Sequence, residues 1–90
     1  MNVRYAPRAL QDLDAIRRYI SKHNPSAAWI VASFIRRTIR NLEHWPYQGR
    51  ATDKQHVRRL TVSTFPYVIF YRVHDGNVLI LTVCHTARDD

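Results

Sequence analysis

The stretch that decides the fold is residues 66–90, PYVIFYRVHDGNVLILTVCHTARDD. Two apolar runs flank an Asp75-Gly76 pair, and such a pair between apolar runs is a strong signal for a β-hairpin whose two central residues have positive φ. Alternation divides the first run into two faces, one with Val68, Phe70 and Arg72 and the other with Tyr67, Ile69, Tyr71 and Val73. A polar tail, residues 85–90, follows the second run.

Upstream of the hairpin, the hydrophobic period changes from about 3.6 to 2 near residue 56. The second half of the chain therefore predicts three strands, over residues 57–62, 66–73 and 77–85. The first half predicts two helices, over residues 7–22 and 25–44. Their apolar stripes are Ala9, Leu13, Ile16 and Ile20 in the first helix, and Ala28, Val31, Ile35, Ile39 and Leu42 in the second.

The connection between the two helices is short. Asn24 is suited to cap the second helix and Pro25 to occupy its first position, where the missing N–H has no consequence. Two helices joined so closely lie antiparallel, as a helical hairpin. Residues 2–5 are weakly strand-like, and residues 46–55 have the composition of a loop.

The order is strand, two helices, three strands (β-α-α-β-β-β), which predicts one α+β domain over residues 1–90. Its antiparallel helical hairpin should pack on one face of a mainly antiparallel sheet. The other face should be partly open to solvent, and a functional surface is expected there.

Arginine dominates the charge of the chain. Lys and Arg number 14 against 7 Asp and Glu, giving a net charge of +7, and twelve of the cations are Arg. Guanidinium groups make planar bidentate contacts with phosphates and carboxylates, so the partner is either nucleic acid or an acidic protein. A single cysteine and the absence of a long apolar run predict a soluble, cytoplasmic protein that does not bind membranes.

No catalytic set stands out in the sequence. The five histidines are scattered without ligand spacing, so neither a metal nor another cofactor is expected. Cys84 lies in an apolar run, where a small filler is the usual role. Asp12 and Asp14 are two residues apart on a helix, point in different directions, and are expected only to complement the helix dipole.

The arginines in or beside the sheet are the better candidates. Either they solvate the open sheet face, or they form a basic surface for RNA, DNA or an acidic segment. Tyr67 and Tyr71 face the same way as Ile69, which favours the core over stacking surfaces. The candidate residues for binding a partner are Arg58, Arg59, Tyr71, Arg72, His85 and Arg88.

These segments together resemble the RelE/ParE superfamily of bacterial toxins from type II toxin–antitoxin pairs. The resemblance covers nearly the whole chain, including YAPRALQDLDAIRRYI, NPSAAWIVASFI, LEHWPYQGR and VRRLTV. Its most specific part is the FYRV strand and the ending H-x-A-R-D, which is similar to the HGARD of the ParE branch, with Thr86 in place of Gly.

The two branches imply different activities. ParE-like members inhibit DNA gyrase and block replication, which is a binding function. RelE-like members cut messenger RNA on the ribosome, often with an Arg at the place of Val68 and a C-terminal tyrosine, and this chain has neither. A third alternative is an inactive relative that binds only its antitoxin. The resemblance also implies a cognate antitoxin, expected to bind through an acidic segment in a toxin–antitoxin hetero-oligomer.

Overall fold

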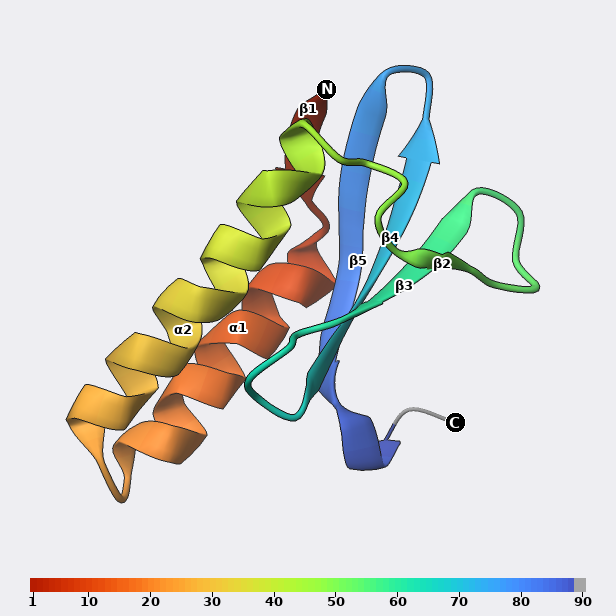
Figure 1. Cartoon of the computed structure of the whole chain (residues 1–90). Coiled ribbons are helices and arrows are strands. Elements are labelled where there is room, and N and C mark those ends of the chain that lie inside the picture. The colour runs from red at the N-terminus through yellow and green to blue at the C-terminus, as the bar shows by residue number, and fades with distance from the viewer. Residues whose placement is uncertain (89–90) are drawn as a thin grey trace.

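The structure is a computed structural model that describes residues 1–88, except for the side chain of Arg88 (Figure 1). The elements, in chain order, are β1 (Asn2–Tyr5), α1 (Pro7–Ser21), α2 (Pro25–Arg40), the 3₁₀ turn η1 (Asn41–Glu43), β2 (Arg50–Ala51), β3 (Val57–Thr61), β4 (Tyr67–His74), β5 (Asn77–His85) and the 3₁₀ turn η2 (Thr86–Arg88). The predicted α+β class and the order of the elements are confirmed.

The five strands form one sheet in the order β1-β5-β4-β3-β2. β1 is parallel to β5, and the other neighbouring pairs are antiparallel. The helices α1 and α2 lie side by side over one face of this sheet, and within residues 1–88 no helix covers the other face (Figure 1). The sheet therefore has a helix-facing side and an outer side.

Two local signals in the sequence are confirmed. Asp75 has φ 50° and Gly76 has φ 74°, so both central residues of the β4–β5 turn are left-handed, as an Asp-Gly hairpin requires. The Asn24 side chain accepts a hydrogen bond from the Ala27 N–H at 3.1 Å and so caps α2. The turn fixes the register of the hairpin, and the cap fixes where the second helix begins.

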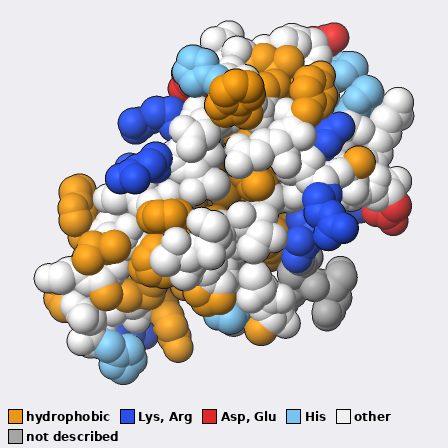
Figure 2. All heavy atoms as spheres, in the orientation of Figure 1, with side chains coloured by type: hydrophobic (Ala, Val, Ile, Leu, Met, Phe, Trp, Pro, Cys, Tyr) orange, Lys and Arg blue, Asp and Glu red, His pale blue; other side chains and the backbone are white. Residues whose placement is uncertain are grey.

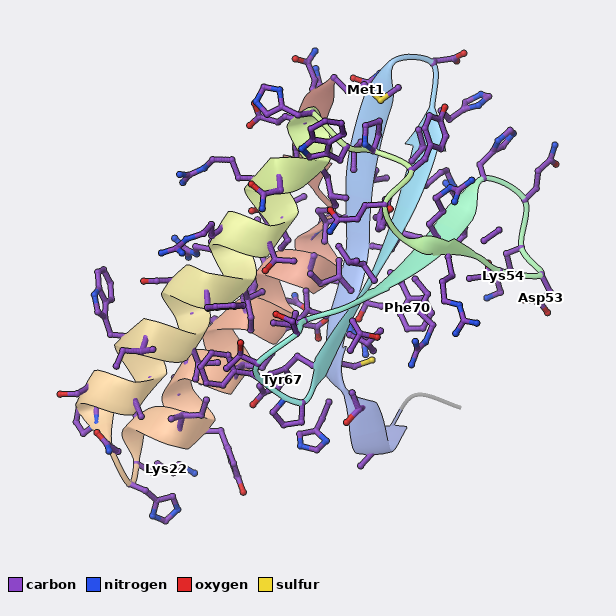
Figure 3. All side chains as sticks on the ribbon, viewed as in Figure 1. Met1, Lys22, Asp53, Lys54, Tyr67 and Phe70 are labelled. Atoms are coloured by element: carbon purple, nitrogen blue, oxygen red, sulfur yellow. The ribbon has the colours of Figure 1, made fainter. Side chains whose placement is uncertain are left out.

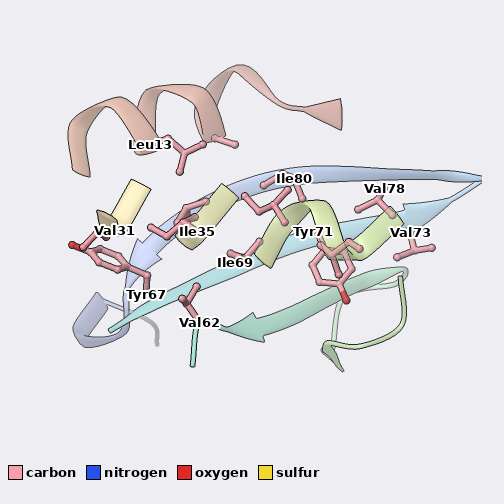
Figure 4. Packing of buried hydrophobic residues seen from close by; sticks show 14 residues of the cluster. Leu13, Val31, Ile35, Val62, Tyr67, Ile69, Tyr71, Val73, Val78 and Ile80 are labelled. Atoms are coloured by element: carbon pink, nitrogen blue, oxygen red, sulfur yellow. The ribbon is translucent and has the colours of Figure 1, made fainter. Parts of the chain in front are cut away.

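The core lies between the helices and the helix-facing side of the sheet (Figure 4). The predicted stripes supply it: Ala9 and Leu13 are buried in α1, and Ile16 and Ile20 pack against them half-buried. Ala28, Val31, Ile35 and Ile39 are buried in α2, and Leu42 in η1. The sheet contributes the four residues predicted to share a face of β4, which are Tyr67, Ile69, Tyr71 and Val73.

Most predicted bounds are within one residue of the observed ones, and the larger differences lie between α2 and β3. α2 ends at Arg40 rather than at residue 44, because the chain tightens into the 3₁₀ turn η1 before Trp45 and Pro46. The predicted loop contains β2, whose residues Arg50 and Ala51 pair with β3. A two-residue strand has no hydrophobic period, so the sequence pattern gives no signal for it.

Asp12 has a structural role that the helix-dipole interpretation missed. β5 is paired with β1 only as far as Ile80. Just after Ile80 its pairing with β4 shifts by one residue, between Phe70 and Tyr71 of β4. Beyond it, the Asp12 carboxylate accepts hydrogen bonds from the Val83 N–H at 3.0 Å and from the Thr82 hydroxyl. Asp12 thereby satisfies a strand edge that would otherwise lack a partner. Asp14 instead pairs with Arg17 and Arg18 in solvent.

Candidate functional site

A row of residues crosses four strands on the outer side of the sheet. Residues paired across neighbouring strands point to the same face. Arg4 of β1 is level with Leu79 of β5, Leu79 is paired with Arg72 of β4, and Arg72 with Val57 of β3. Two exposed guanidinium groups, those of Arg4 and Arg72, thus stand on one face with a half-buried leucine between their strands.

A second row lies beside the first. Phe70 of β4 is paired with Arg59 of β3, and Arg59 with Arg50 of β2. Figure 3 shows Phe70 on the side of the sheet away from the helices. We refer to Arg4, Arg50, Arg59 and Arg72, contributed by four different strands, as the arginine face. Figure 2 shows Lys and Arg side chains gathered beside β2 and β3.

The floor between these arginines is apolar. Val57 and Val68 point to the outer side and are buried, and Phe70, Leu79 and Cys84 are half-buried. An apolar centre with arginine and aromatic side chains around it is the composition typical of protein interfaces. Arg59 also donates to the Thr61 hydroxyl at 3.3 Å, which orients its side chain along β3.

Tyr71 belongs to the core, so its prediction as a binding residue needs correction. Its side chain is 0% exposed. Its hydroxyl donates to the Pro46 carbonyl at 2.9 Å and accepts from the Gly49 N–H at 2.8 Å. Burial raises the pKa of this phenol, against the lowering effects of the Gly49 N–H and Arg58. Tyr71 therefore fixes the loop over the sheet and offers no surface to a partner.

Arg58 lies apart from the arginine face. It is paired with Tyr71 and so points to the helix-facing side, beyond the end of α2. Its guanidinium donates to the Gly49 carbonyl at 2.7 Å and lies over the Tyr47 ring, 4.9 Å from the ring centroid. A guanidinium stacked on an aromatic face contributes about 0.5–2 kcal/mol of attraction. Arg58 thus helps to hold residues 47–49.

His85 lies at the opposite end of the sheet from Arg58. It is paired with Tyr67 and therefore also points to the helix-facing side. Its ring meets the Tyr67 ring edge-on with centroids 5.5 Å apart, and its Nδ1 accepts from the Ala87 N–H at 3.1 Å. Burial raises the pKa of the Tyr67 phenol. The side chain of Arg88 lies outside the described residues, so its prediction stays untested.

The five predicted residues whose side chains the structure describes thus do not form one site. Among these five, only Arg59 and Arg72 share a surface, as diagonal neighbours on the outer side. Arg4, Arg50 and Phe70 join them there and were missed. The alternation in NVRY separates Arg4 from the apolar Val3 and Tyr5, which is a usable signal. Arg50 had none, because its strand is too short to show a period.

Within residues 1–88 no three His, Cys, Asp or Glu side chains come together as a group able to hold a metal ion. Over the same residues, neither helix has the length and apolar character to span a bilayer.

Comparison with known proteins identifies the family. Residues 3–90 match the model of the ParE toxin of the type II toxin–antitoxin system parDE. Toxin RelE2 of Caulobacter vibrioides is 42% identical over 81 residues, covering 90% of each chain. The chromosomal ParDE system of P. aeruginosa contains a chain with TM-score 0.86 and 26% identity, covering 94% of this chain and 95% of that one.

The fold is also that of the isolated E. coli RelE toxin, with TM-score 0.67 and 14% identity over 93% of this chain and 82% of that one. The chain belongs to the ParE toxin family of type II toxin–antitoxin systems, within the RelE/ParE superfamily. Membership implies a cognate antitoxin as partner.

Proposed function

We propose that this chain is a ParE-like toxin that inhibits DNA gyrase by binding and so blocks replication. The observation that carries the proposal is the arginine face around an apolar floor, which has the composition of a protein-binding surface and holds no acid–base pair. Val68 occupies the place where RelE-like nucleases often carry Arg, and it is 0% exposed. No tyrosine follows Tyr71 in the sequence.

The alternative is a RelE-like endoribonuclease that cuts messenger RNA on the ribosome. It is favoured by the name of the relative RelE2 and by the exposed His85 at the end of β5. Positioned acid–base groups each contribute roughly a hundredfold or more in rate, so a nuclease without them would be slow. Variants of the arginine face and variants of His85 and Arg88 therefore distinguish the two functions.

The proposed function is tested with the purified chain in two assays, gyrase with relaxed plasmid and ribosomes programmed with a defined message. We expect inhibition of supercoiling, and no cleavage of the message. The double variant Arg59→Ala/Arg72→Ala should lose inhibition. Arg36→Ala/Arg37→Ala removes the same charge from the exposed side of α2 and should keep it. Cleavage abolished by His85→Ala or Arg88→Ala, with normal supercoiling, would establish the alternative.

We propose that the antitoxin binds away from the arginine face, with an acidic segment in a groove on the helical side. A groove of about 340 Å³ lies between β1, α1 and α2, and its lining is Val3, Tyr5, Leu10, Leu13, Arg36, Ile39, Arg40 and Glu43. Five of the lining side chains are aliphatic or aromatic, and the charged ones are two arginines against the single acid Glu43. An amphipathic acidic segment matches both properties. Neutralising part of the +7 charge would add to its affinity.

A further inference from the structure

The loop after η1 exposes two large aromatic side chains. Trp45 is 68% exposed and Tyr47 is 62% exposed. They border an open hollow of about 570 Å³ that is lined by His44, Trp45, Pro46, Tyr47 and Gln48. Figure 2 shows hydrophobic side chains gathered at this end of the molecule. We refer to residues 44–48 as the aromatic loop; it lies outside the arginine face and has no role in the functions argued above.

The aromatic loop is held from both sides. The Trp45 N–H donates to the Asn41 carbonyl at 3.0 Å, and the Gln48 N–H donates to the Trp45 carbonyl at 3.1 Å. Beneath it, the Tyr71 hydroxyl bonds to both Pro46 and Gly49. Because its backbone is already ordered, the aromatic loop loses little conformational entropy when a ligand binds at the rings.

The lining favours a flat ligand. Four of its five side chains end in planar groups: an imidazole, an indole, a phenol and an amide. The Pro46 ring is the single aliphatic side chain among the five, which is unlike a groove that takes a peptide helix. The guanidinium of Arg58 adds a further plane over the Tyr47 ring. Unpaired nucleobases stack on such aromatic and guanidinium planes.

Positive charge continues from the aromatic loop in two directions. The chain runs from it into β2, where Arg50 is paired with Arg59 of the arginine face. A second hollow, of about 370 Å³, has Tyr47 in its wall together with Lys54, His56 and Arg58, and with the single acid Asp53. Cations on either side of stacking rings match a strand that carries one phosphate per base.

We propose that the aromatic loop binds unpaired nucleotides of single-stranded nucleic acid, with bases on Trp45 and Tyr47 and phosphates on Arg50 and Arg58. This proposal does not depend on whether the target is gyrase or the ribosome, because strand binding at the loop requires neither of them. Its chemistry suits DNA and RNA alike, and the test has an arm for each.

The chain has two tryptophans, Trp29 and Trp45, so each can be made the sole reporter. Trp29 is 72% exposed on α2 and serves as a matched control. Trp29→Phe leaves Trp45 as the sole tryptophan, and Trp45→Phe leaves Trp29. Both variants are titrated with single-stranded DNA of roughly a dozen nucleotides, a length within the usual site sizes, and with RNA of the same sequence. We expect one or both strands to quench the fluorescence of Trp45, and neither to quench that of Trp29.

Affinity is measured in parallel by fluorescence anisotropy of the labelled strand. Trp45→Ala and Tyr47→Ala should each weaken binding roughly tenfold, and Trp45→Phe should restore most of it because a phenyl ring still stacks. Trp29→Ala should change nothing. Arg50→Ala should lower the slope of log affinity against log salt by about one, as loss of a phosphate contact does.

Two results would overturn the site. One is equal binding by the wild-type chain and Trp45→Ala, with circular dichroism showing both folded. The other is quenching of Trp45 by polyglutamate at the same charge concentration as the DNA, which would make the loop a peptide-binding surface. Gyrase inhibition by these variants is measured in a separate assay. Its loss or retention does not affect the conclusion about binding of single-stranded nucleic acid.

Discussion

The hydroxyl of Tyr71 connects two segments that are distant in sequence. The ring packs in the core of the sheet, and the oxygen reaches the loop at Pro46 and Gly49. Gly49 is confined by this contact, because a Cβ there would lie 2.7 Å from the hydroxyl and 2.9 Å from the Arg59 carbonyl. The underside of the aromatic loop is therefore held by one oxygen atom, next to a residue that has no side chain.

Tyr71→Phe should lower the free energy of unfolding by about 1–3 kcal/mol, since it leaves the buried Gly49 N–H and the Pro46 carbonyl without this partner. Tyr47→Phe is the control, because that hydroxyl belongs to a 62% exposed residue and its loss should have little effect. Urea denaturation followed by circular dichroism measures both. Equal stability of Tyr71→Phe and wild type would show that the bridge contributes nothing.

The tyrosines also predict how stability depends on pH. Burial raises the pKa of Tyr5, Tyr67 and Tyr71 above the usual 10.0. The folded state keeps these phenol protons at a pH where the unfolded state has lost them. Stability should therefore be full below pH 10 and fall as pH rises through the folded values. Unfolding midpoints measured from pH 8 to 11 should fall less steeply in Tyr71→Phe; identical slopes would contradict this.

The strand β5 has hydrogen-bond partners on both of its edges and from a helix. It pairs with β1 on one side, with β4 on the other, and with the Asp12 carboxylate past the end of β1. α1 therefore lies over the sheet and also extends its hydrogen bonding by a side chain. This contact fixes the position of α1 along the strand.

Asp12→Ala should lower the free energy of unfolding by about 1–3 kcal/mol, because the Val83 N–H and the Thr82 hydroxyl lose their acceptor. Asp14→Ala is the matched control on the same helix. Its carboxylate pairs with Arg17 and Arg18 at the surface, and exposed pairs contribute about 0–1 kcal/mol. Thermal unfolding compares the two, and a larger effect at Asp14 would refute the role of Asp12.

The sequence predicted those elements whose apolar residues repeat. Both helices, the three long strands and the Asp75-Gly76 turn were found, because each has a period or a turn signal of its own. The arginine face was found only in part. Its members Arg4 and Arg59 come from strands that are not neighbours in the chain, and they share a surface through the pairing order of the sheet. Local patterns do not contain that order.

At the scale of the whole molecule, the two surfaces proposed for binding lie on different faces. The arginine face lies on the outer side of the sheet, and the groove lined by Leu10 and Arg36 lies on the helical side. A toxin with this layout can be bound by an antitoxin at a place separate from the surface proposed for its target.

Antitoxin binding should therefore have an electrostatic and an apolar part. Affinity measured by calorimetry should fall clearly between about 0.05 and 0.5 M salt, over which screening of surface charges becomes strong. Leu10→Asp should weaken binding at both salt concentrations. Ile30→Asp is the control, since Leu10 is 55% exposed and Ile30 is 58% exposed, but only Leu10 lines the groove. Affinity unchanged by salt, or equal losses in the two variants, would contradict this placement.

The parallel pairing of β1 with β5 also governs when the protein can fold. Asn2 is level with Asn77 and Tyr5 with Ile80, so the first strand has no partner until the last one has been synthesised. Contacts so distant in sequence require closure of a long loop and slow the folding reaction. During translation β1 therefore has no strand to pair with until β5 has left the ribosome. The complete five-stranded sheet can therefore form only after nearly the whole chain has been synthesised.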